Sequence, residues 1–330
     1  MDLNNRRELR ATAEQRLRSS DSAPKISLIY AGIVTLVTLV STTVSFILGE
    51  QVSRFGGLSN MGMRSILSSL QTMLPIAGNL FLMPLTLGFV GTMLRVSRGQ
   101  FASPQGMKIG FDRFWVLLRA TLLQSLLYLL AAVVVSQISF SLFLMTPLSR
   151  NFMNFVMALS SPGADVNALL ADPNLESSLM QSLVPGILLT LALSLVVVIP
   201  LFFRYRMVNY ILLDKPGTGA FAAMRQSAMM MRKKHLALFK LDLGFWWYYL
   251  AGIVASLVCY GDMLLPLIGV PIPFSPTVSF FVFFFAYLLI NLAITVYLRP
   301  YVEVTYAGAY EAIRPRETTG GAVLGNIFQL

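Results

Sequence analysis

The sequence predicts an all-α fold, a polytopic helical membrane protein with six transmembrane helices and further amphipathic helices at the interface. The 330 residues are 56% hydrophobic and 12% charged, and their mean hydropathy is +0.70, whereas soluble domains carry about 25% charged residues. Apolar runs of about 20 residues, long enough to cross a bilayer core of roughly 30 Å, recur along the chain. The charges lie at the ends of these runs, so the composition excludes an ordinary soluble enzyme.

The first element, within residues 1–25, is predicted to be a basic amphipathic helix on the inner leaflet. Leu9, Ala13 and Leu17 recur at four-residue spacing, which places them on one helix face, and arginines surround them. A Ser-Asp-Ser-Ala-Pro break follows. The basic residues of this arm that we expect to contact lipid or a partner are Arg6, Arg7 and Arg10.

Six segments are apolar enough and long enough to span a membrane. The predicted spans are residues 26–48, 73–94, 120–143, 184–203, 243–260 and 277–298. The second contains Pro84, which removes a helical hydrogen bond and predicts a kink. The third belongs to an apolar pattern over residues 115–146 that is longer than a bilayer requires, so it must tilt or protrude. Residues 26–298 are thus expected to form one membrane domain.

The basic residues predict the orientation of the chain. Of the 25 Lys and Arg residues, 22 fall in the N-terminal arm, in residues 95–119, in residues 204–240 or after the sixth span. The positive-inside rule then places both termini in the cytoplasm. We interpret the first span as an uncleaved helix, because its apolar region is too long for a signal peptide and no small-residue cleavage site follows. The net charge of +10 indicates attraction to anionic lipid headgroups, and nucleic acid is not an expected partner.

The two longer outer connections are expected to contain short helices. Residues 147–181 have an apolar spacing of their own, which favours helices over the outer surface, and residues 52–71 are expected to behave in the same way. Neither forms a separate soluble domain.

The inner connection, residues 204–242, predicts an interfacial helix that leads into the fifth span. Phe221, Met224, Ala228 and Met231 recur at helical spacing. The methionines at 229–231 favour either a soft protein-binding surface or a helix face buried against headgroups or neighbouring spans. The adjacent basic run, predicted to contact anionic lipid or a partner protein, is Arg232, Lys233 and Lys234.

Residues 299–330 are predicted to form a cytoplasmic helix and tail. Glu303, Tyr306, Tyr310 and Glu311 recur at three- and four-residue spacing after the Arg-Pro that ends the sixth span. This stripe could dock onto the basic run at 232–234 or onto a partner protein. The alternative is an interfacial helix with aromatic-belt residues.

The usual motifs of catalysis and cofactor binding do not occur. His235 and Cys259 are the single histidine and cysteine, so no metal, haem or other cofactor site is expected. Residues 99–108 superficially resemble a phosphate-binding loop, but their spacing is wrong and no Ser or Thr follows the lysine. Without a nucleophile motif either, we expect no enzymatic activity.

Polar residues inside the predicted spans allow a second interpretation. No Asp, Glu, Lys or Arg lies near the middle of a span, which argues against a proton relay. The strongest polar residues are Asn79, Gln124 and Asn291. If they converge, they could line a neutral polar pathway, although hydrogen bonding between helices is an alternative role.

A set of weak motifs, taken in their order along the chain, resembles a known family. The motifs are Asn5-Arg6-Arg7-Glu8-Leu9-Arg10, residues 210–214 (Tyr-Ile-Leu-Leu-Asp), residues 239–245 (Phe-Lys-Leu-Asp-Leu-Gly-Phe) with Trp247, Pro300-Tyr301 and Tyr310-Glu311. Together the chain resembles the bacterial integral-membrane family called domain of unknown function 975. Lys233 stands where the family usually has glycine, and Gly244 where it usually has serine. The resemblance implies a multi-span bacterial membrane protein and brings no activity or catalytic residues.

From these observations we expect a non-enzymatic protein of the bacterial cytoplasmic membrane. It would act through lipid or protein contacts at the inner face, with anionic lipids or a membrane protein as partners. The alternative function is a small transporter or channel for a neutral or amphipathic solute.

Overall fold

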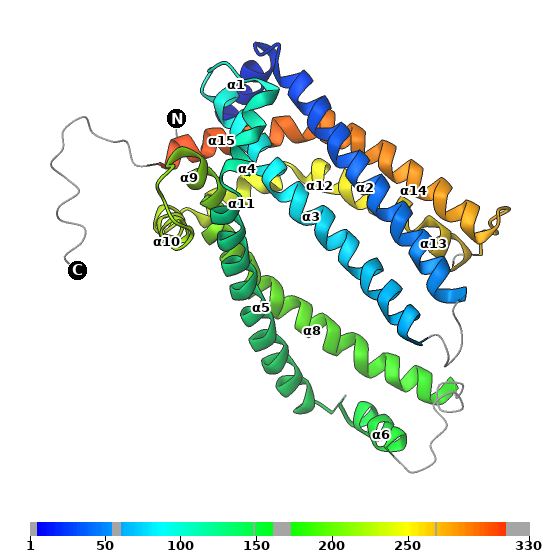
Figure 1. Cartoon of the computed structure of the whole chain (residues 1–330). Helices are drawn as coiled ribbons and strands as arrows, with labels where there is room; N and C mark the ends of the chain where they lie inside the picture. The colour runs from blue at the N-terminus through cyan, green and yellow to red at the C-terminus, as the bar shows by residue number, and fades with distance from the viewer. Residues whose placement is uncertain (1–4, 55–60, 148, 161–172, 268, 315–330) are drawn as a thin grey trace. The chain divides into compact units, whose positions relative to one another are not determined.

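The computed structural model describes residues 5–54, 61–147, 149–160, 173–267 and 269–314, and the regular structure in them is helical (Figure 1). The chain divides into two compact units, residues 1–117 with 207–330 and residues 118–206. The helices of the first unit are α1 (Arg6–Arg18), α2 (Ala23–Arg54), α3 (Met61–Ser97), η2 (Pro104–Lys108), α4 (Ile109–Asp112), α9 (Val208–Asp214), α10 (Ala220–Met230), α11 (His235–Leu243), α12 (Trp246–Cys259), α13 (Gly261–Leu267), α14 (Pro276–Ala293), the π-helical turn η3 (Ile294–Leu298) and α15 (Arg299–Ile313). The second unit contains most of α5 (Phe114–Leu144), α6 (Ser149–Leu159) and α8 (Pro173–Tyr205).

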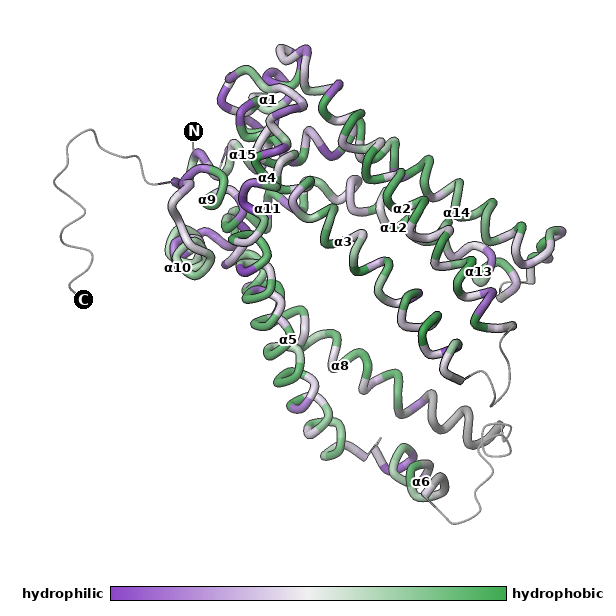
Figure 2. Tube along the Cα trace, viewed as in Figure 1, coloured by the Kyte–Doolittle hydropathy of each residue, from purple (hydrophilic) through white to green (hydrophobic). Residues whose placement is uncertain are grey.

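The prediction of a polytopic helical protein is confirmed. Five helical stretches are long and apolar enough to cross a membrane: Ala23–Ser53, Gly62–Ser97, Phe114–Leu144, Leu183–Asp214 and Pro276–Ile313. Many apolar side chains of these helices are exposed, and Figure 2 shows that their residues are predominantly hydrophobic. This pattern is expected of helices that face lipid.

The fifth predicted span is not one straight helix. Residues 243–260 fall across a break, with α11 on one side and α12 on the other, and the two helices are bent by 60°. The 14 residues of α12 reach only about 21 Å at 1.5 Å per residue, short of a bilayer core. A sixth crossing therefore exists only if the bent pair acts as one span.

The sixth predicted span does not end at Pro300. The helical stretch continues from Pro276 to Ile313, because Pro300 occupies the first turn of α15, where its missing N–H removes little. The preceding π-helical turn, η3, widens the helix at this point. Arg299 next to it is half-buried: its guanidinium carbon lies 5.0 Å from the Tyr30 ring centroid, and its Nε lies 3.7 Å from Glu303 Oε1.

The two connections that were predicted to lie on the outer side differ from the expected short helices. Of residues 147–181, α6 forms one helix as expected, but α8 begins already at Pro173, and residues 161–172 lie outside the described part. Residues 52–54 and 61–71 belong to the ends of the long helices α2 and α3, while residues 55–60 are outside the described ranges.

The core of the first unit lies where α1 and α15 cross the ends of α2 and α3. Its buried members are Ala13, Ala23, Ile26, Tyr30, Leu85, Phe89, Met93, Val96, Ala102, Met107 and Val304. The rings of Tyr30 and Phe89 stack with centroids 4.3 Å apart, and the Tyr30 and Thr86 hydroxyls are hydrogen-bonded at 3.0 Å. Side chains from residues far apart in the sequence therefore hold this end of the unit together.

Two glycines, Gly88 and Gly110, allow close backbone contact between α3 and the segment η2–α4. A Cβ at Gly88 of α3 would stand 2.0 Å from the carbonyl oxygen of Met107, and a Cβ at Gly110 of α4 would stand 1.8 Å from the carbonyl oxygen of Pro84. The segment η2–α4 thus lies directly on α3 between Pro84 and Gly88. Helix α3 itself continues through Pro84.

Candidate lipid or partner contact site

The N-terminal helix α1 is held against the end of α11. Asn5 caps α1: its Oδ1 accepts from the Glu8 N–H, and its Nδ2 donates to Glu8 Oε2 at 2.8 Å. Arg6 donates to the Lys240 carbonyl at 3.2 Å, and Arg10 donates to the Leu241 carbonyl at 3.3 Å. These carbonyls belong to the last turn of α11, and the Leu241 carbonyl also accepts from the Gly244 N–H at 3.0 Å. The two guanidinium groups add hydrogen bonds at this helix end and complement its negative dipole.

Arg10 has a structural role in the first unit, and contact of its side chain with lipid or a partner stays a prediction. Its guanidinium carbon lies 4.9 Å from the ring centroid of the fully buried Phe245. A Cβ at Gly244 would overlap the Arg10 guanidinium. Gly244 therefore gives Arg10 the space to reach the end of α11.

A cluster of four charged residues joins α3, α9 and α15. Arg98 Nη2 lies 2.6 Å from Asp214 Oδ1, and its Nε donates to Glu311 Oε1 at 2.8 Å. Arg314 Nη1 donates to Asp214 Oδ2 at 2.8 Å, and the Tyr310 hydroxyl donates to the same oxygen at 3.1 Å. We call Arg98, Asp214, Glu311 and Arg314 the ionic cluster. Burial lowers the pKa of Arg98, but the hydrogen bonds and charges of Asp214 and Glu311 outweigh it and raise that pKa above its ordinary value.

The structure contradicts two of the three roles predicted for the Tyr and Glu stripe on α15, and docking of the stripe onto a partner protein stays a prediction. The stripe does not dock on residues 232–234: Glu311 binds Arg98, and the Tyr210 hydroxyl donates to Glu303 at 3.3 Å. Tyr306 and Tyr310 are not belt residues either, because both are buried within the protein. The Tyr310 ring stacks on Tyr210 with centroids 5.4 Å apart.

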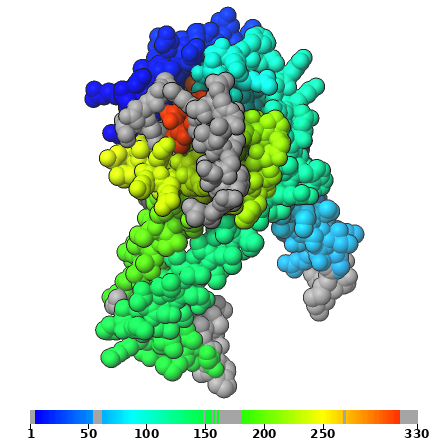
Figure 3. Space-filling view, turned by 90° about the vertical axis from the view of Figure 1, so that its left-hand side faces the viewer, coloured from blue at the N-terminus to red at the C-terminus, as the bar shows by residue number. Residues whose placement is uncertain are grey.

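The exposed side of α10 and α11 alternates apolar and basic residues. Phe221 is 74% exposed and Leu236 63% exposed. Exposed residues of the two helices and of the turn between them form what we call the α10–α11 face: Phe221, Arg225, Met229, Arg232, Lys233, Leu236, Lys240 and Leu243. In Figure 3, α1 (blue), part of α15 (orange-red) and the region of α10 and α11 (yellow-green) share the visible side of the first unit.

The opposite side of α10 is buried in the protein. Ala223, Met224, Ser227 and Met230 lie on it, and Met231 follows, fully buried. The Ser227 hydroxyl accepts a hydrogen bond from the Met207 N–H. The burial expected for the methionine cluster is therefore correct for Met230 and Met231, and Met229 remains on the exposed face.

The other predicted contact residues differ in exposure. Arg7, Arg232 and Lys233 are exposed, Arg6 is exposed although it binds α11, and Lys234 is half-buried. Lys233 has a φ of 63°, in the left-handed region that favours glycine. The turn between α10 and α11 thus has a backbone geometry that glycine would adopt more easily, and the lysine side chain is exposed.

Two of the three candidate pathway residues, Asn79 and Asn291, lie on different helices of the first unit. Asn79 is exposed on α3, and Asn291 on α14 donates to the Tyr287 hydroxyl of its own helix at 3.4 Å. Gln124 belongs to α5 in the second unit. A shared polar pathway stays a prediction.

The fold and this site define a multi-pass helical membrane protein whose scattered sequence motifs meet at one end of the first unit. Four of these motifs supply Arg6 and Arg10, Asp214, the end of α11 and Tyr310-Glu311. The chain belongs to the family described as Protein of unknown function (DUF975), whose model matches residues 1–317. No curated protein and no solved structure matches the chain.

Sequence reasoning missed the ionic cluster and the role of Arg10. The available signal was that Asp214, Tyr310 and Glu311 stand in the motifs that resemble the family. Nothing in the sequence near Arg98 or Arg314 indicated their partners. The partners lie 100 or more residues away in the chain, in the pairs Arg98–Asp214, Arg98–Glu311 and Arg314–Asp214.

Proposed function

We propose that this protein is a multi-pass protein of the bacterial plasma membrane, with both termini in the cytoplasm, that acts without catalysis by binding anionic lipid headgroups through its α10–α11 face. The single observation that carries the proposal is the alternation of exposed apolar and basic residues on that face. Apolar side chains can insert at the boundary of headgroups and acyl chains while the basic groups bind phosphates.

The arrangement of the first unit supports this function. Helices α1 and α15 lie together at the same end of the unit as α10 and α11 (Figure 1), and purple, hydrophilic segments gather there (Figure 2). The ionic cluster uses the acidic groups of Asp214 and Glu311 internally, so these carboxylates do not offset the basic residues on the α10–α11 face. This leaves the exposed arginines and lysines to set the charge of the face.

The proposal predicts a lipid preference that depends on two arginines. The purified protein in an uncharged detergent is titrated with dioctanoyl phosphatidylglycerol or dioctanoyl phosphatidylcholine, and thermal unfolding is recorded. We expect phosphatidylglycerol to raise Tm, and Arg225→Gln with Arg232→Gln to weaken its binding by about thirtyfold in Kd, at about 1 kcal/mol for each charge removed. High salt should reduce the Tm shift.

The matched control changes two exposed arginines elsewhere, Arg64→Gln with Arg150→Gln. An equal loss of lipid binding in this control would contradict the proposed site. Absence of any phosphatidylglycerol effect, together with a stoichiometric protein that leaves when Arg225 and Arg232 are changed, would favour a protein partner.

Transport of a neutral or amphipathic solute is the alternative function. Two features favour it: α3 contains Pro75 and Pro84, and the π-helical turn η3 begins three residues after Asn291, since such turns are frequent at functional sites. Reconstituted vesicles separate the alternatives. Solute flux that requires the wild-type protein and is lost in an Asn79→Leu, Asn291→Leu variant would support transport.

A further inference from the structure

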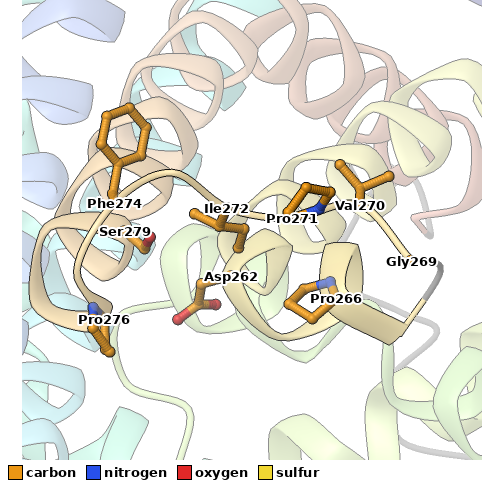
Figure 4. Close-up of a pocket in the computed structure, with 9 residues that line it drawn as sticks. All are labelled: Asp262, Pro266, Gly269, Val270, Pro271, Ile272, Phe274, Pro276 and Ser279. Carbon is orange, nitrogen blue, oxygen red and sulfur yellow. The ribbon is translucent and has the colours of Figure 1, made fainter.

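A cavity of about 460 Å³ lies between α13, α14 and the loop that joins them, in the first unit. Its lining is apolar apart from two residues, Asp262 and Ser279 (Figure 4). A concave apolar pocket with a small number of convergent polar groups is the usual form of a small-molecule site. This cavity is separate from the α10–α11 face and from the ionic cluster, and neither of them uses its residues.

The Ser279 hydroxyl is unused by the described protein. Ser279 is 3% exposed, and its Oγ is buried without a hydrogen-bond partner among the described residues. A buried hydroxyl without a hydrogen-bond partner is unfavourable. Its position in the wall of a cavity therefore indicates that a ligand supplies the missing hydrogen bond. Figure 4 shows the Ser279 hydroxyl and the Asp262 carboxylate beside the same space.

Asp262 gives the cavity its charge. It is the single charged residue in the lining, and within the described ranges no hydrogen bond or salt bridge engages its carboxylate. A half-buried carboxylate surrounded by prolines and aliphatic side chains attracts a cation more strongly than an exposed one, because the surroundings screen the charge less.

The loop also supplies few hydrogen-bond donors. Pro271, Pro273 and Pro276 have no N–H. The N–H groups of Gly269 and Val270 already bind the carbonyls of Pro266 and Leu265, both at 3.0 Å. The two polar side chains of the lining, the Asp262 carboxylate and the Ser279 hydroxyl, can both accept hydrogen bonds, so the cavity suits a ligand that donates. The prolines also stiffen the loop, which lowers the entropy lost when a ligand binds.

The loop and α13 are fixed in place by α14. A Cβ at Gly261, the first residue of α13, would stand 2.6 Å from the Phe283 ring of α14, so the two helices touch directly where α13 begins. The two walls that carry Asp262 and Ser279 are thus held together before any ligand arrives.

We propose that this cavity binds a primary ammonium group attached to an apolar body. An ammonium carries three donors, enough to bind the Asp262 carboxylate and the Ser279 hydroxyl together, while the apolar body contacts the proline and aliphatic wall. A divalent cation fits less well, since calcium takes six to eight oxygen ligands and these two side chains provide three. The ammonium could belong to a free amine or to the ethanolamine headgroup of a phospholipid, whose anionic phosphate would have to stay outside the cavity.

The test uses 2-phenylethylammonium as the probe and its neutral analogue 2-phenylethanol as the comparison. Binding to the full-length protein in detergent is measured by isothermal titration calorimetry. We expect the ammonium to bind and the alcohol to bind at least about tenfold more weakly. Asp262→Asn should weaken ammonium binding by about tenfold or more, and Asp112→Asn, which changes an exposed carboxylate of α4, should leave it unchanged.

Ser279→Ala separates a ligand role from a structural one. Because the hydroxyl has no partner in the described protein, its removal should leave the Tm of the free protein unchanged or raise it, while ammonium binding falls. A lower Tm with unaltered binding would overturn the assignment of Ser279. Equal binding of the ammonium by the wild type and by Asp262→Asn would overturn the site.

Native mass spectrometry distinguishes the two sources of the ammonium. Phosphatidylethanolamine that stays on the wild type, is lost from Asp262→Asn and is displaced by 2-phenylethylammonium would identify the lipid source. Binding of the free amine without retained phosphatidylethanolamine would identify a soluble amine. If neither the amine nor phosphatidylethanolamine binds in an Asp262-dependent manner, the proposal is wrong.

Discussion

Replacement of Gly88 by alanine is expected to destabilise the protein by about 3 kcal/mol, the upper end of the usual range for an overfilled interior. The new Cβ would stand 2.0 Å from the Met107 carbonyl oxygen and within 3 Å of the Met107 Cα. These are backbone atoms, so no side-chain rotation relieves the overlap. The segment η2–α4 would have to separate from α3, and the core that includes Met107 would open with it.

Gly32→Ala in α2 is the matched control, because nothing lies within 4 Å of a Cβ at that position. Alanine is favoured over glycine in a helix by up to about 1 kcal/mol, so this variant should be as stable as the wild type or slightly more stable. Thermal unfolding in detergent, followed by circular dichroism, compares the two. Equal Tm values for Gly88→Ala and Gly32→Ala would show that α3 and the η2–α4 segment do not touch as described.

Asp214→Asn should destabilise the protein by about 2 to 3 kcal/mol. The carboxylate binds Arg98, Arg314 and the Tyr310 hydroxyl. Its replacement by an amide leaves Glu311 as the one remaining carboxylate for the two guanidinium groups of the ionic cluster. Removal of one partner from a fully buried ion pair costs about 3 to 5 kcal/mol. We expect less here because the Asp214 side chain is 12% exposed and that of Arg314 is 36% exposed, which allows water to screen the charges.

A double-mutant cycle isolates the interaction energy between Arg98 and Asp214. If Arg98 and Asp214 interact as described, Arg98→Gln and Asp214→Asn together should destabilise the protein by less than the sum of their separate effects. Asp112→Asn, at an exposed carboxylate, is the control and should change Tm little. Strictly additive effects of the Arg98 and Asp214 variants would contradict the ionic cluster.

The sequence was sufficient for the fold class because the signal is local. A bilayer requires long apolar helices with internally satisfied backbones, and each such helix is visible in a window of about 20 residues. The break near residue 244 was not visible in this way. The residues on both sides of it are apolar, and the reason for the glycine is Arg10, which lies more than 200 residues earlier and fills the space beside it.

Contacts between segments far apart in the sequence also explain what was not predicted at the candidate site. Glu311 and Tyr310 have the periodicity of an exposed polar stripe, and only the fold shows that Arg98 and Asp214 cover them. Arg10 was grouped with Arg7 because both are basic residues of one helix, yet helix geometry turns Arg10 towards Phe245 and leaves Arg7 exposed. Charge type is readable from sequence, but which charges are already paired depends on contacts between distant segments.

Native mass spectrometry of the protein released gently from its own membrane tests the central claim most directly. The wild type, the Arg225→Gln, Arg232→Gln variant and the Arg64→Gln, Arg150→Gln control are compared for bound lipid. Our account predicts anionic lipid on the wild type and the control, and its loss from the α10–α11 variant. Anionic lipid bound equally to all three proteins, or to none of them, would contradict the α10–α11 face as the lipid-binding surface.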